Sequence, residues 1–122
     1  MEINKNQCAK NKIANLAISM QLGTTDLIEG FREIYGLWLE SGLPYDEMYN
    51  AISLINDETE TVIKGDIRKN FSKDFFKKKD LWEKDYLIDT LPLMNEILAY
   101  LSKIPIVEEP EDPYAWPFDE YK

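Results

Sequence analysis

"DLIEGFREIYGLWLES", from Asp26 to Ser41, decides the fold, because its apolar residues recur three and four positions apart. That spacing places them on one face of an amphipathic α-helix. Thr24 or Thr25 can cap the start of this helix, and Gly42 supplies a stop at its end. The stripe that the helix turns toward a core consists of Leu27, Ile28, Phe31, Ile34, Tyr35, Trp38 and Leu39.

Helical patterns also flank this stretch. The spacing predicts one helix over residues 10–20, ended by Gly23. Another is predicted to begin near Pro44, with Asp46 and Glu47 in its first turn, and to break at residues 56–57. The following residues, 56–66, are predicted to form an acidic loop.

A long helix of interleaved aromatic and charged residues is predicted to begin at Ser72. Pro92 either kinks this helix or ends it at Thr90, in which case a fifth helix follows. The chain is therefore predicted to be all-α. We expect a single-domain bundle of four to five helices over residues 1–106 and an extended acidic, proline-rich C-terminal tail over residues 107–122.

Composition limits the chemistry that this chain can perform. With 122 residues and 44% hydrophobic residues it suits one packed domain. Cys8 is the single cysteine and histidine is absent, which excludes an internal disulfide, a Cys/His metal site and a Ser-His-Asp triad. We therefore expect a protein that is not an enzyme and that needs no cofactor. A carboxylate-dependent, metal-assisted hydrolase stays open as the less favoured alternative.

Charge is distributed unevenly along the chain, whose net charge is −9. Residues 1–63 and 85–122 are strongly acidic, whereas residues 64–84 carry eight basic and four acidic side chains. An acidic body repels nucleic acid and favours a basic protein partner. No segment resembles a leader or a membrane span, so the sequence predicts a cytoplasmic protein that binds neither membranes nor nucleic acid.

Three separated pieces resemble a helical bacterial family of unknown function: "DLIEGFREI" at residues 26–34, "NDETET" at 56–61 and "RKNFSKD" at 68–74. In that family an acidic Asp-x-Glu-Thr string precedes an Arg-x-x-aromatic-Ser/Asn segment. The likeness covers Leu22 to Tyr86. Phe71 stands where the family has tryptophan, and the acidic tail is not part of the pattern, so the resemblance implies nothing about the tail.

Small size, acidity and the all-helical pattern are also similar to the immunity proteins of bacterial toxin systems, notably those of contact-dependent growth inhibition. Such proteins bind one toxin domain, often a basic nuclease, and block it inside the producing cell. The resemblance implies the same function for this chain, with a cognate basic toxin domain as its partner. A regulatory or self-associating module, for example a dimer through the Phe75 and Trp82 helix, is the alternative.

Acidic groups near aromatic side chains are the candidate partner-binding residues, since carboxylates meet a basic surface and aromatics anchor interfaces. They fall on the third helix and its loop and in the tail. The loop acids could also ligate a divalent cation, but the regular spacing of a calcium loop is absent. The candidates are Asp46, Glu47, Asp57, Glu58, Glu60, Glu108, Glu109, Glu111, Asp112 and Trp116.

Two basic features have plain structural interpretations beside functional ones. Lys77, Lys78 and Lys79 could bind nucleic acid or the acidic tail, but nearby acids such as Asp80 and Glu83 favour ordinary pairs within the helix. Arg32, on the apolar second helix, is expected to pair with a neighbouring glutamate or to hold the acidic loop in place.

Overall fold

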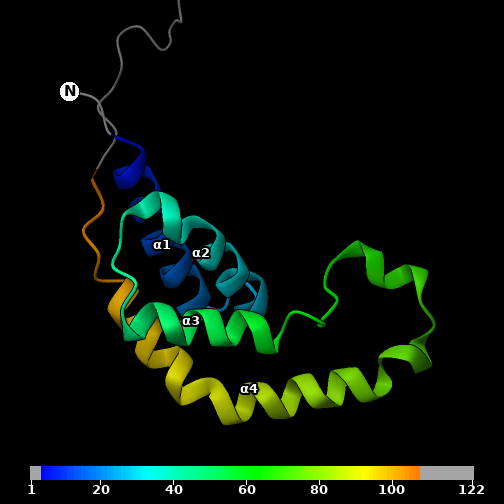
Figure 1. The fold of residues 1–122 in the computed structure, drawn as a ribbon. Helices are drawn as coiled ribbons and strands as arrows, with labels where there is room; N and C mark the ends of the chain where they lie inside the picture. Colours follow the sequence, from blue (N-terminus) through cyan, green and yellow to red (C-terminus); the bar gives the residue numbers. More distant parts are fainter. Residues whose placement is uncertain (1–3, 108–122) are drawn as a thin grey trace, which may run out of the picture.

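The computed structural model describes residues 4–107, and within that range it contains four α-helices, one short 3-10 helix and no strand (Figure 1). The prediction of an all-α fold with four helices is confirmed, whereas residues 108–122 of the predicted tail lie outside the described range. The elements in chain order are α1 (Lys5–Gln21), α2 (Leu27–Ser41), α3 (Glu47–Glu58), η1 (Asp66–Asn70) and α4 (Lys73–Leu101).

Polar side chains set the starts of the helices. The Asn4 side chain accepts a hydrogen bond from the Gln7 N–H, so α1 begins at Lys5 and not at residue 10 as predicted. Asp26 caps α2, so the prediction of a threonine cap was wrong. Ser72 caps α4 as predicted.

Helices α2 and α3 end in different ways, α2 at a glycine and α3 at a side-chain hydrogen bond. Gly42 ends α2 in the left-handed conformation, with φ of 71°. The predicted break at residues 56–57 was wrong, because α3 continues to Glu58. There Thr59 is buried, and its hydroxyl donates to the Ile55 carbonyl at 2.7 Å. This side-chain bond occupies a carbonyl oxygen of the last turn and keeps the turn closed.

The core lies between α1, α2, α3 and the last turns of α4. Trp38 is its largest member and is 2% exposed, with its indole N–H donating to the Pro44 carbonyl at 3.2 Å. Gly30 allows α1 to approach α2 closely, because a methyl group at this position would overlap the Met20 side chain. The remaining large, fully buried side chains are Ile13, Ile28, Phe31, Ile34, Ile52, Ile55, Met94, Ile97, Leu98 and Leu101.

Helix α4 has two halves with different surroundings. It runs through Pro92 as one helix, so of the two alternatives for Pro92 the separate fifth helix does not form. Figure 1 shows α4 changing direction in its yellow part. Pro92 lies inside α4 and lacks the N–H for a helical hydrogen bond, which is a common cause of such a bend. From Tyr86 onward α4 packs on the core, whereas residues 73–85, the projecting half of α4, extend beyond the bundle (Figure 1).

Candidate protein-binding surface

The segment between α3 and α4 is tied to the bundle by Arg32 of α2. One guanidinium nitrogen, Nη2, donates to the carbonyls of both Thr59 and Val62, each at 2.6 Å. The expectation that Arg32 holds this loop is confirmed, but it does so through backbone oxygens and not through carboxylates. The planar guanidinium can serve two acceptors from one side chain, so Arg32 fixes the direction in which the chain leaves α3.

The same segment is tied to the projecting half of α4 by two basic residues. Arg68 contacts both carboxylate oxygens of Asp80 at 2.9 Å and donates to the Ile63 carbonyl at 3.2 Å. Its guanidinium carbon lies 3.9 Å from the centre of the Phe76 ring. The projecting half of α4 is therefore held by the loop that covers it and not by the main core.

Lys64 links the loop to two helices. Its ammonium pairs with Asp26, the cap of α2, at 3.2 Å and with Glu83 of α4. Burial alone would lower the pKa of Lys64, but the hydrogen bonds to the two carboxylates outweigh it and the pKa is raised. Asp80 and Glu83 thus pair with the loop, and the prediction that they pair within their own helix was wrong.

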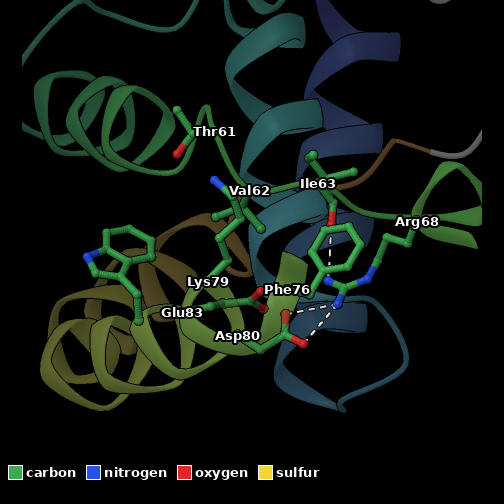
Figure 2. A pocket seen from close by; sticks show the side chains of 9 residues that line it. Thr61, Val62, Ile63, Arg68, Phe76, Lys79, Asp80 and Glu83 are labelled. Atoms are coloured by element: carbon green, nitrogen blue, oxygen red, sulfur yellow. Dashed lines mark hydrogen bonds and ion pairs between the residues drawn. The ribbon is translucent and has the colours of Figure 1, made fainter. Parts of the chain in front are cut away.

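A pocket of about 240 Å³ opens where the loop meets α4 (Figure 2). Figure 2 shows Arg68 reaching across the Phe76 ring to Asp80, so that one ion pair forms part of the wall. Val62, Ile63, Phe76 and Trp82 give the wall an apolar part, and polar and charged side chains complete it. The pocket is smaller than the usual site for a drug-sized ligand. The lining residues are Thr61, Val62, Ile63, Arg68, Phe76, Lys79, Asp80, Trp82 and Glu83.

The candidate acids of the third helix do not gather at one point. Asp46 caps α3, where its side chain accepts hydrogen bonds from the backbone N–H groups of Met48 and Tyr49. Glu47 follows in the first turn, whereas Glu58 lies eleven residues later, about 16 Å along the helix axis. The acids therefore occupy both ends of α3. All of them, Asp46, Glu47, Asp57, Glu58 and Glu60, are exposed.

Glu47, Ala51, Leu54 and Glu58 follow one another at steps of four, three and four residues, which places them along one side of α3. We call this row the α3 stripe. Its two glutamates are exposed, and Leu54 between them is 53% exposed. The two glutamates and Leu54 are thus open to solvent, whereas Ala51 is half-buried against the core.

Glu58 has a partner within the chain. The Tyr86 hydroxyl donates to its carboxylate at 2.8 Å, so α3 touches α4 at this point. Burial, together with the negative charge and hydrogen bond of Glu58, raises the pKa of Tyr86 to about 12. This contact joins residues 28 positions apart, and no local sequence pattern predicts it.

Aromatic rings continue the surface along the projecting half of α4. Phe71 and Phe75 stack with ring centres 4.8 Å apart, and Trp82 stacks on Tyr86 at 5.1 Å. Phe75 and Trp82 remain 42% and 45% exposed. Exposed aromatics of this kind are common anchors of protein interfaces.

The candidate residues Glu108, Glu109, Glu111, Asp112 and Trp116 lie outside the described residues. The described chain reaches Val107, whose backbone N–H donates to the Asn11 side chain at 3.0 Å and whose carbonyl accepts from the same side chain at 2.7 Å. The start of the predicted tail is thus fixed on α1.

Neither a family model, nor a curated protein, nor a solved structure matches this chain. In the part of the chain from residue 4 to residue 107, no helix is long and apolar enough to cross a membrane. Over the same residues, no three acidic or cysteine side chains converge in a way that could hold a metal ion.

Proposed function

We propose that this chain is an immunity-type protein of the cytoplasm that binds a cognate bacterial toxin domain and blocks it sterically and electrostatically. The observation that carries the proposal is the α3 stripe, an exposed acidic row with Leu54 at its centre. The chain as a whole carries a net charge of −9. A basic, nuclease-like domain is the partner that this surface suits, and its binding needs neither a cofactor nor turnover.

The acids of α3 act mainly on the encounter between the two proteins. Complementary fields raise the association rate, and the gain falls as salt screens the charges. Leu54 then loses water against the partner and slows dissociation. Asp57 and Glu60 widen the acidic field around the C-terminal end of α3. Asp46 adds charge at the other end and also caps the helix.

The tail supplies the second contact region of the proposal. Glu108, Glu109, Glu111 and Asp112 would face basic groups of the toxin, with Trp116 as the aromatic anchor. The first test is a pull-down with the product of the adjacent gene, because an immunity protein is normally encoded beside its toxin. The full chain is compared with a chain ended after Ile106. Recovery of one basic polypeptide supports the proposal, and its loss on truncation assigns the tail to the contact.

A charge reversal separates the α3 stripe from the general acidity of the chain. Glu47→Lys with Glu58→Lys should lower the association rate at low salt by at least about tenfold. The matched control is Glu40→Lys with Glu96→Lys, which changes net charge equally at exposed positions of α2 and α4. Equal rates for the two double variants, or a rate independent of salt, would show that the α3 stripe does not guide binding.

A further inference from the structure

The outward side of α4 carries a second row of exposed residues that the proposed function leaves unused. Lys77, Leu81, Lys84 and Ile88 follow one another at steps of four, three and four residues. We call this row the α4 stripe. Leu81 is 60% exposed and Ile88 is 62% exposed, which makes them two of the most exposed large apolar side chains of the described chain. Leu91, three residues further along, continues the row and is 41% exposed.

The alternation of four-residue and three-residue steps is the spacing of a helix that packs along another helix. A helix that contacts only solvent on this side gains nothing from large apolar residues there. Lys77 and Lys84 lie on the same row and form no ion pair among residues 4–107. The α4 stripe therefore suits an acidic helix with an apolar centre.

The chain itself contains a helix face of that description. The α3 stripe has the same steps as the α4 stripe and the same length, eleven residues or about 16 Å. Both charges of the α3 stripe are negative, whereas both charges of the α4 stripe are positive. Within one molecule the two stripes do not cover each other, since Leu54 and Leu81 both remain exposed.

We propose that the α4 stripe of one molecule packs on the α3 stripe of a second copy of this chain. In an antiparallel pair Leu81 meets Leu54 and Lys77 meets Glu58. Further along the pair Lys84 lies opposite Ala51 and Ile88 lies opposite Glu47. The Lys84 ammonium reaches Glu47 from the neighbouring turn, and Ile88 packs on the methylene groups of Glu47. Each copy carries both stripes, so a two-fold arrangement makes this contact twice and closes as a dimer.

Self-association and toxin binding both use the α3 stripe, so the toxin would bind the monomer. This inference does not depend on the identity of the toxin or on its existence. It is measured on the pure full-length chain, and its failure would leave the proposed function standing.

The test is sedimentation equilibrium of the full chain at low salt, over concentrations from about 10 μM to about 1 mM. We expect the mass to rise from 14.3 kDa toward twice that value. A constant monomer mass over the whole range would overturn the proposal. A dimer that forms only after residues 107–122 are removed would also overturn it, because that segment would then be what covers the α4 stripe in the full chain.

A charge exchange tests the pairing of the two stripes. Chains with Lys77→Glu and Lys84→Glu, or with Glu47→Lys and Glu58→Lys, should each dimerise at least about tenfold more weakly than the parent chain. A mixture of the two variants should dimerise again, because each α4 stripe then meets an α3 stripe of opposite sign. The control, Lys12→Glu with Lys69→Glu, changes exposed lysines outside both stripes and should leave the dimer intact. Failure of the mixture to dimerise would contradict the pairing.

Discussion

Arg32→Ala is the substitution that most directly tests how the loop after α3 is held. It removes two charge-assisted hydrogen bonds, to the carbonyls of Thr59 and Val62. Thr59 is fully buried, so water cannot easily replace the lost donor at its carbonyl. Each such bond contributes about 1.5 kcal/mol or more, and we expect the free energy of unfolding to fall by about 3 kcal/mol.

Urea unfolding followed by circular dichroism measures this loss. Arg32→Lys retains the charge but presents one ammonium in place of the planar fork, and it should recover about half of the loss. The control is Glu33→Ala, an exposed neighbour on α2, which should change stability by less than about 0.5 kcal/mol. Hydrogen exchange of residues 59–65 should accelerate in Arg32→Ala before exchange in the core does. A loss no larger than that of the control would refute the role given to Arg32.

Three further predictions follow from single contacts. Gly30→Ala should destabilise the protein by about 1–3 kcal/mol, because the added methyl group overlaps Met20. Thermal unfolding measures this loss, and a rise in stability would contradict the close approach of α1 and α2. Asp46→Ala should lower the free energy of unfolding by about 1 kcal/mol, because α3 loses its cap, whereas Glu47→Ala should lower it much less. Equal losses of stability in urea unfolding would count against the cap. Folding raises the pKa of Tyr86 from 10.0 to about 12, so the contribution of Tyr86 to stability is complete below pH 10 and is lost as pH rises through 12. Tyr86→Phe should flatten that part of the plot of stability against pH. An unchanged plot would count against the contact with Glu58.

The helices could be predicted from sequence because they depend on local patterns. The spacing of Phe31, Ile34 and Trp38 gives α2, and Gly42 gives its end, without reference to the rest of the chain. The prediction failed where a distant or side-chain contact decides the structure. Residues 56–57 favour a turn, but α3 continues beyond them because the Thr59 hydroxyl donates a hydrogen bond to the Ile55 carbonyl.

The candidate surface was predictable as a set of residue types but not as an arrangement. The acids of residues 46–60 could be selected from charge alone, yet their separation along α3 follows from the length of the helix. The network that holds the loop depends on Lys64 and Arg68 meeting carboxylates 12 to 38 residues away. The presence of basic residues in an acidic chain indicated that ion pairs would form, but the sequence alone does not show which carboxylates are their partners.

Because the two halves of α4 rest on different neighbours, they need not lose structure together. Residues 73–85 depend on the loop through Arg68 and Lys64, whereas the turns from Met94 to Leu101 belong to the core. The loop and the projecting half form a unit that can open at a lower free energy than the bundle, with the boundary just before Tyr86. A partner that binds this unit could reshape it while the four-helix core stays folded.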